Sequence, residues 1–236
     1  MASKPERSQD TIQVTYDWER WALLRQYREK AQNIISTLEQ RHMQAIVHGS
    51  IARGDVDKNS DIDIFIPNPP SSFLIETALE QTKIPVATRM IIQATPAYAM
   101  KAYIEIDATT IVSFPLMAPR RVEREFYLFS GEINLTQLKT ETRVRGVDKR
   151  LMLIEPTQKG HVESSILNRE EQVAKALGVA VETVLDRVHA LMKRDAVGRT
   201  GVFVKKELGP NETFELAMKR LAAENPAVRR RLKTSS

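Results

Sequence analysis

The residues best suited to chemistry lie between positions 49 and 63 of the 236-residue chain. Gly49 and Ser50 follow an apolar segment, and a single residue separates Asp61 from Asp63. Side chains two positions apart on a strand project from the same face, so the two carboxylates are expected side by side. Such carboxylates repel each other unless a cation lies between them, and a divalent ion there can also bind nucleotide phosphates. The spacing therefore predicts metal-assisted phosphoryl transfer.

The Gly-Ser pair predicts a phosphate-binding turn. A glycine lets backbone N–H groups approach a phosphate closely, and the start of a helix favours negative charge. Ser50 adds a hydroxyl donor, while Arg53, one helical turn further on, is expected to hold either the loop or a phosphate. His48, directly before Gly49, is expected to pack against the turn or cap it.

A site with two metal ions needs a third carboxylate, which would also take a proton from the attacking hydroxyl. The segment that follows Tyr103 places Glu105 and Asp107 on the same face of one strand. We expect Asp107 to serve, with Glu105 as the alternative. Because the chain has no cysteine and only four scattered histidines, the metal ligands are expected to be carboxylates, which suit Mg²⁺ or Mn²⁺.

The motif Gly49-Ser50-x2-Arg53-Gly54-x5-Ser60-Asp61-Ile62-Asp63 resembles the signature of the DNA polymerase β-like nucleotidyltransferase superfamily. Its local form is similar to archaeal CCA-adding enzymes and to the small nucleotidyltransferases of toxin–antitoxin pairs, over roughly residues 30–115. CCA addition itself is not carried over, because the chain is too short for the tail and body domains of those enzymes.

The resemblance implies a role for each motif residue. Gly49 and Ser50 would contact the triphosphate in a nucleotide-binding motif that includes Arg53 and Ser60. Asp61 and Asp63 would bind two Mg²⁺ ions, and Asp107 would complete the site. The implied reaction moves a nucleoside monophosphate from a nucleoside triphosphate, such as ATP, onto a hydroxyl and releases pyrophosphate.

Hydrophobic periodicity predicts the elements that position these residues. Helices are expected at residues 16–41, 73–83, 120–129, 169–177, 181–194 and 214–224. Strands are expected at 44–47, 61–67, 86–93, 103–114 and 151–154. Ser71 or Ser72 is expected to cap the helix at 73–83, with Glu76 available for the capping interaction. The fold class is α/β (α+β), a nucleotidyltransferase mixed sheet flanked by helices and followed by a smaller winged-helix-like domain.

The polar segment 155–160, which contains a proline and a glycine, is expected to be a linker. It would divide the chain into a nucleotidyltransferase catalytic domain, residues 1–155, and a winged helix-turn-helix-like basic domain, residues 156–236. Residues 187–236 contain 12 Lys or Arg against 5 Asp or Glu, whereas the whole chain has a net charge of +5. Such a segment either meets nucleic acid or forms a solvated face.

Within the second domain, a small Ala174, a turn at Gly178 and an apolar Val184 are typical of a helix-turn-helix. Residues 195–206 are expected to form a wing with Arg199 at its tip. Acidic Glu182 and Asp186 on the second helix oppose contact with a phosphate backbone, so the unit can equally serve packing or dimerisation.

Further polar residues follow the expected catalytic strands. The basic residues among them are Arg143, Arg145, Lys149 and Arg150. They either bind the triphosphate or the acceptor, or they are ordinary surface charges. His161, beside Glu163 and Ser164, is either part of a functional polar cluster or a linker histidine.

The sequence thus predicts a metal-dependent nucleotidyltransferase with RNA as the acceptor. The alternatives are transfer to a protein or small molecule, and a non-catalytic winged-helix scaffold that binds nucleic acid. No apolar run is long enough to cross a bilayer, and the polar start lacks a secretory signal, so a cytoplasmic location without membrane contact is expected.

Overall fold

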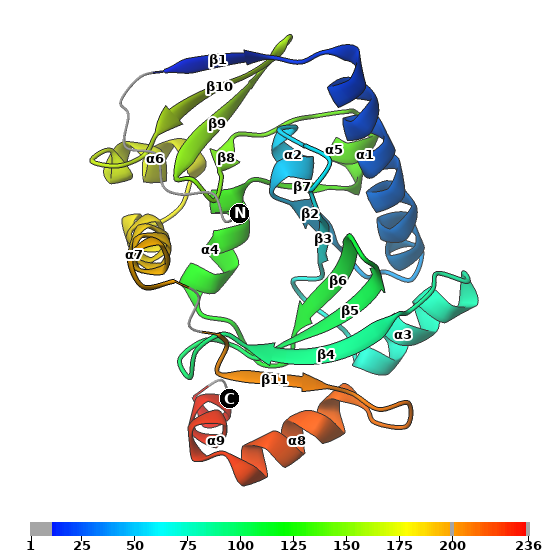
Figure 1. Ribbon diagram of the computed structural model, residues 1–236. Coiled ribbons are helices and arrows are strands. Elements are labelled where there is room, and N and C mark those ends of the chain that lie inside the picture. Colours follow the sequence, from blue (N-terminus) through cyan, green and yellow to red (C-terminus); the bar gives the residue numbers. More distant parts are fainter. Residues whose placement is uncertain (1–10, 199–200, 235–236) are drawn as a thin grey trace. The chain divides into compact units, whose positions relative to one another are not determined.

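The computed structural model describes residues 11–198 and 201–234 (Figure 1). Contacts divide the chain into two compact units. Unit 1 contains residues 1–32, 47–60 and 121–200, and unit 2 contains residues 33–46, 61–120 and 201–236. The units interleave along the chain, and the division into residues 1–155 and 156–236 stays a prediction. None of the helices described has the length and apolar character that a membrane span requires.

The helices predicted from periodicity are confirmed, and each end lies within three residues of its predicted position. They are α1 (Trp18–Glu39), α3 (Ser72–Gln81), α4 (Arg121–Ser130), α6 (Glu170–Leu177), α7 (Val181–Val197) and α8 (Phe214–Glu224). Three further helices were not predicted as separate elements: α2 (Ser50–Arg53), α5 (Leu135–Lys139) and α9 (Pro226–Lys233).

Unit 1 contains an antiparallel sheet in the order β1-β10-β9-β8 (Figure 1). Its strands are β1 (Ile12–Thr15), β8 (Gly146–Val147), β9 (Met152–Thr157) and β10 (Gly160–Ser165). The linker predicted at 155–160 is wrong, because these residues form the β9–β10 hairpin. Pro156 fits this strand because β8 pairs with β9 only as far as Ile154, which leaves the proline on an open edge.

Gly160 marks a close approach of two backbones rather than a flexible joint. It pairs with Thr15 of β1, and a Cβ atom added at Gly160 would lie 2.0 Å from the carbonyl oxygen of Val14. Only glycine therefore fits at the start of β10.

Helices α4, α6 and α7 share one apolar core with the sheet of unit 1. The core is formed by Phe129, Val147, Leu151, Leu153, Ile166, Val173, Ala174, Val179, Val184, Val188 and Leu191. The turn between α6 and α7 lies at Gly178, whose φ of 68° is in the left-handed region that favours glycine. The packing predicted for Ala174 and Val184 is confirmed, since both side chains are buried.

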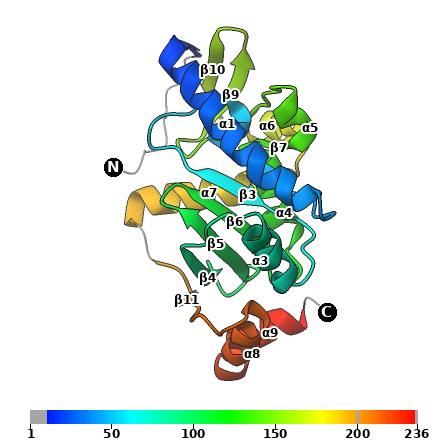
Figure 2. The ribbon, with the colours of Figure 1, turned by 90° about the vertical axis from the view of Figure 1, so that its right-hand side faces the viewer.

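Unit 2 contains a mixed sheet in which β11, β4, β5, β6 and β3 follow one another. Its strands are β3 (Ile62–Phe65), β4 (Thr88–Gln93), β5 (Lys101–Asp107), β6 (Thr110–Pro115) and β11 (Val204–Glu207). β3 and β6 are parallel and the other pairs are antiparallel. Phe214 of α8 packs edge-on against Phe114 of β6, with ring centroids 5.5 Å apart. Figure 2 shows α8 and α9 together beyond β11, so the predicted mixed sheet with flanking helices is confirmed.

Two local predictions in unit 2 are wrong. The single strand expected at 103–114 is the β5–β6 hairpin, which turns at Ala108 and Thr109. Glu76 does not cap α3, since it pairs with Arg89 at 2.7 Å. The cap comes instead from Glu215 of α8, whose carboxylate accepts hydrogen bonds from the backbone N–H and the hydroxyl of Ser72.

The wing predicted at 195–206 is also wrong. α7 continues to Val197, and β11 pairs with β4 in the sheet of unit 2 rather than with a partner in a separate hairpin. Arg199, expected at the tip, lies outside the described residues. β11 has the sequence Val204-Lys205-Lys206-Glu207, and its single apolar residue does not separate the edge of a sheet from a wing.

Replacing Gly160 by alanine is expected to lower the free energy of unfolding by at least about 2 kcal/mol, because the new methyl group would collide with the Val14 carbonyl. Urea unfolding followed by circular dichroism measures this change. Gly209→Ala is the matched control, since nothing lies within 4 Å of the added Cβ there, and its effect should stay within about 0.5 kcal/mol. Equal effects of the two substitutions would contradict the close approach.

Candidate functional site

The predicted turn at Gly49 is formed in unit 1. Gly49 follows β2 (Ile46–His48) with φ 77° and ψ −142°, and α2 begins at Ser50. The N–H of Gly49 donates to the carbonyl of Gly131 at 2.9 Å, which fixes the start of the turn. A Cβ at Gly49 would have no neighbour within 4 Å, so the backbone is open on that side. The first N–H groups of a helix have no acceptor inside the helix, and they can therefore bind an anion.

Arg53 holds this loop through hydrogen bonds within unit 1. Its guanidinium is buried and donates from Nη1 to the Ser130 carbonyl at 2.6 Å and from Nη2 to Asp55 at 2.8 Å. Of the two roles open to Arg53 in the sequence, the structure gives it the contacts of a residue that holds the loop.

Arg28 on α1 is a second arginine of this kind, and it was not among the residues predicted for the site. It is buried, and it donates from Nε to the Ile51 carbonyl at 3.0 Å and from Nη2 to the Ala52 carbonyl at 3.1 Å. Burial, followed by repulsion from Arg143, lowers the pKa of Arg28 to about 10. The sequence pattern indicates that Arg28 is buried, because it occupies an apolar position of α1, four residues after the buried Leu24.

The basic residues after the predicted catalytic strands are used for structure in unit 1. Arg143 donates to the carbonyls of Gly160 and Thr157 at the turn of the β9–β10 hairpin. Arg150 pairs with Asp148 at 2.7 Å and also with Glu163. These contacts favour the interpretation of Arg143 and Arg150 as structural residues.

His161 and His48 are also held by neighbours within unit 1. The ring nitrogen Nδ1 of His161 lies 2.6 Å from the hydroxyl of Tyr16, and both side chains are buried. Burial lowers the pKa of His161 and raises that of Tyr16 to about 12, so both groups are held uncharged at neutral pH. His48 packs edge-on against Tyr127, with ring centroids 4.8 Å apart, which confirms its predicted packing role.

Asp61 and Asp63 lie at the start of β3 in unit 2. Asp61 directly precedes the strand and is exposed, whereas Asp63 is half-buried within it. The intervening Ile62 is fully buried, as is Ile64, so the predicted alternation of acidic and apolar side chains is confirmed. Ser60 comes just before them, and its hydroxyl accepts a hydrogen bond from the N–H of Asp57 at 2.9 Å.

The β5–β6 hairpin brings Asp107 close to this pair through the backbone. Asp107 pairs with Thr110, and Thr110 pairs with Ile62, the residue between the two aspartates. The Oδ1 atom of Asp107 accepts a hydrogen bond from the N–H of Thr109 at 3.0 Å, and the Thr109 carbonyl accepts one from the N–H of Ile62 at 2.7 Å. A single residue, Thr109, therefore joins the third carboxylate to the strand of the first two.

Glu105 is directed to the other side of β5. Its Oε2 atom accepts a hydrogen bond of 2.5 Å from the hydroxyl of Thr88 on β4. Since β4 and β6 lie on opposite sides of β5, this bond draws the Glu105 carboxylate away from β3. The irregularity between Glu105 and Asp107 further separates their positions along the hairpin.

The donor chemistry of the three aspartates suits a hard divalent cation, because every available ligand atom is a carboxylate oxygen. Over residues 11–198 and 201–234, however, no group of three or more His, Asp or Glu side chains is placed so that it could hold a metal ion. The assignment of Asp61, Asp63 and Asp107 as metal ligands stays a prediction.

Comparison with known families identifies the same part of the chain. A family model described as a nucleotidyltransferase domain matches residues 28–167, which is more than half of the sequence. The matched span includes Arg28, the Gly49 turn, β3 and the β5–β6 hairpin, and it continues through β10. No curated protein was found to match the chain.

Replacing Arg28 by methionine, which has a similar length and no charge, is expected to lower the free energy of unfolding by about 1–3 kcal/mol. The reason is that the carbonyls of Ile51 and Ala52 lose their buried donors. Urea unfolding measures the effect. Arg25→Met on the exposed face of α1 is the matched control and should leave stability unchanged within about 0.5 kcal/mol. If the two variants were equally stable, the contacts of Arg28 would not hold the loop.

Proposed function

The chain belongs to the nucleotidyltransferase domain family, and on this premise we propose that it moves a nucleoside monophosphate from a nucleoside triphosphate onto a hydroxyl of RNA. Pyrophosphate is the second product. A divalent cation, Mg²⁺ or Mn²⁺, assists the transfer. The observation that carries the proposal is the link through Thr109, which ties Asp107 to the residue between Asp61 and Asp63.

In this proposal the three carboxylates divide the work. Asp61 and Asp63 hold the cation, which neutralises charge on the phosphates and lowers the pKa of the attacking hydroxyl when it is bound. Asp107 orients the acceptor hydroxyl and takes its proton. Glu105 is the alternative for this role, but its bond to Thr88 engages the carboxylate on the far side of β5.

The turn at Gly49 binds the triphosphate. Its open glycine face and the first N–H groups of α2 supply donors, and the hydroxyl of Ser50 adds another. Arg53 and Arg28 do not contact the nucleotide directly, since both guanidinium groups bind carbonyls of unit 1. They fix the loop, and their charges favour an anion in front of it. Ser60 closes the turn that leads to Asp61.

RNA is the acceptor that fits the charge of the protein best. The net charge is +5 and the excess lies in the last fifty residues, as expected of a protein that meets a polyanion. Transfer to a protein or small molecule, and a scaffold without catalysis, are tested by the same experiment.

The experiment offers labelled ATP, CTP, GTP and UTP with Mg²⁺ to the full chain, with total cellular RNA and with the protein itself as acceptors. Label is expected in RNA with the wild type and at least about 100-fold less with the variant Asp61→Asn/Asp63→Asn. Glu171→Gln/Glu182→Gln, which changes two exposed carboxylates on α6 and α7, is the matched control and should keep full activity.

Two other outcomes would each contradict part of the proposal. Label in the protein would show that the protein, rather than RNA, is the acceptor. Absence of transfer, together with the absence of Mg²⁺-dependent binding of any of the four nucleotides, would leave the non-catalytic scaffold as the better account.

The third carboxylate is tested by Asp107→Asn and Glu105→Gln. We expect Asp107→Asn to reduce kcat by at least about 100-fold, because it removes the group that takes the proton. Glu105→Gln keeps an acceptor for Thr88 and should retain activity within about tenfold. A larger loss of kcat in Glu105→Gln than in Asp107→Asn would show that Glu105 takes the proton. Circular dichroism of both variants checks that the hairpin is intact.

A further inference from the structure

The two last helices of unit 2 carry an excess of positive charge. α8 and α9 together contain six Lys or Arg residues and two Glu residues. The exposed cations are Lys219, Arg220, Arg229, Arg230 and Lys233. Arg220 pairs with Glu212 at 3.3 Å, whereas Lys219, Arg230 and Lys233 form no ion pair with any carboxylate in the part of the chain that the structure describes. These three cations are available to an anionic partner.

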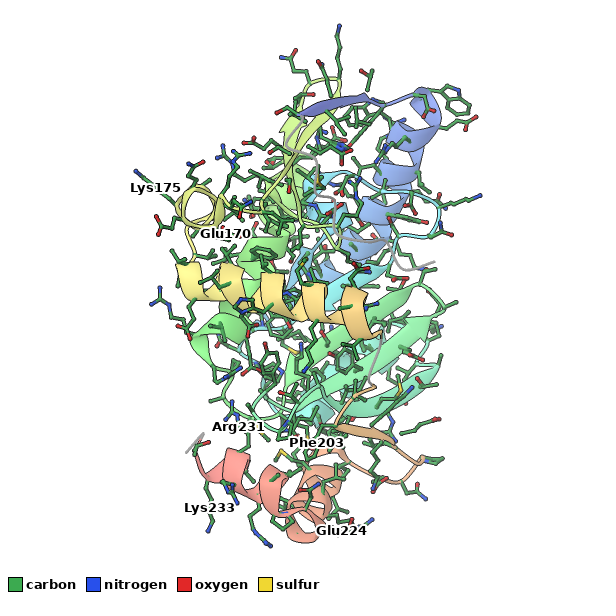
Figure 3. The ribbon with its side chains drawn as sticks, turned by 60° about the vertical axis from the view of Figure 1, so that its left-hand side comes forward. Glu170, Lys175, Phe203, Glu224, Arg231 and Lys233 are labelled. Atoms are coloured by element: carbon green, nitrogen blue, oxygen red, sulfur yellow. The ribbon has the colours of Figure 1, made fainter. Side chains whose placement is uncertain are left out.

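Hydrogen bonds join α9, on which part of this basic face lies, to loops beside the sheet of unit 2. Arg231 reaches the opposite way from the exposed cations and donates to the carbonyls of Ala97 and Ala118 at 3.0 and 2.8 Å. Figure 3 labels Arg231 and Lys233 on α9. Asn225 caps α9, and Arg229 donates to the Ala223 carbonyl, which ties α9 to the end of α8. The helix backbones that carry the cations are therefore held in place before any partner binds.

The helix pair α6–α7, where the sequence suggested nucleic-acid contact, is a poorer candidate. It contains five Asp or Glu residues against four Lys or Arg residues. The N-terminus of α7 is already occupied, because the Glu125 carboxylate accepts from the N–H of Ala180 at 2.8 Å and from the hydroxyl of Thr183 at 2.6 Å. Burial would raise the pKa of Glu125, but these bonds outweigh it and lower the pKa, so the group stays negative. A phosphate cannot share that position.

We propose that the exposed face of α8 and α9, which carries Lys219, Arg230 and Lys233, binds the phosphate backbone of single-stranded RNA. The choice of RNA among polyanions rests on the proposed function. An anionic membrane fits less well, because an interfacial helix needs an exposed apolar face. In α9 the apolar Val228 is fully buried, and the exposed positions carry Pro226, Arg229, Arg230 and Lys233.

The test measures binding of a labelled single-stranded RNA to the full chain by fluorescence anisotropy over a series of KCl concentrations. Arg230→Ala/Lys233→Ala is expected to weaken binding on the order of 10-fold at low salt. Each phosphate contact on a single strand contributes about 0.7 to the slope of log affinity against log salt, so this slope should fall by about 1.4. Both residues are exposed, and thermal unfolding should show no loss of stability.

A matched control removes two positive charges from the helix pair α6–α7. Lys175→Ala/Lys193→Ala changes two exposed lysines of α6 and α7, and it should leave the affinity within about twofold of the wild type. Glu224→Gln, which removes an exposed negative charge from the end of α8, should strengthen binding about twofold (Figure 3). Equal losses in the two double variants, or a larger loss in Lys175→Ala/Lys193→Ala, would overturn the proposal.

Failure of this proposal is separable from failure of the proposed function. Asp61→Asn/Asp63→Asn should bind RNA as the wild type does, because the basic face does not include these residues. RNA binding that depends on Arg230 and Lys233 without any nucleotide transfer would reject only the proposed function. Unchanged RNA binding by Arg230→Ala/Lys233→Ala, or a loss confined to binding of phosphatidylserine vesicles, would reject only the RNA surface.

Discussion

Buried guanidinium groups determine the conformation of the loop that follows β2. A charge taken out of water costs several kcal/mol unless hydrogen bonds or an opposite charge compensate for it, so each buried arginine requires acceptors at fixed places. Arg28 finds them in the carbonyls of Ile51 and Ala52, and Arg53 finds them in Ser130 and Asp55. The loop is thus rigid on its inner side and open at Gly49 on the other. A loop built in this way can bind an anion without first having to be ordered, which lowers the entropic cost of binding.

The sequence could predict those parts of the structure that follow from local patterns. The Gly-Ser turn and the alternation around Asp61 and Asp63 are local patterns, and both were found where the sequence indicated them. The helices follow from apolar spacing that repeats over several turns. The β5–β6 hairpin was not predicted, because Ala108 and Thr109 between its strands include no Gly, Asn or Pro, and Asp107 was interpreted as a residue of the site. The Asp107 side chain forms the turn instead, by accepting from the N–H of Thr109.

Other differences arise from contacts between residues that are far apart in the sequence. A proline and a glycine in a polar segment are typical of linkers and of hairpins, and only the contact of Gly160 with β1 separates the two. The cap of α3 comes from Glu215, and a motif search near Ser72 does not reach it. Arg28 is the instructive exception, because a charged residue at an apolar helical position is visible in the sequence and signals a buried polar contact.

The position of β11 beside β4 has a consequence for the growing chain. β4 ends at Gln93, but the strand that covers its outer edge begins only at Val204. During synthesis the hydrogen-bonding groups along that edge stay without their final partner until residues 94–207 have been added and have left the ribosome. An open edge is a template for strand addition by other chains, so β11 protects the nascent protein against aggregation. A chain released before residue 204 would lack that protection.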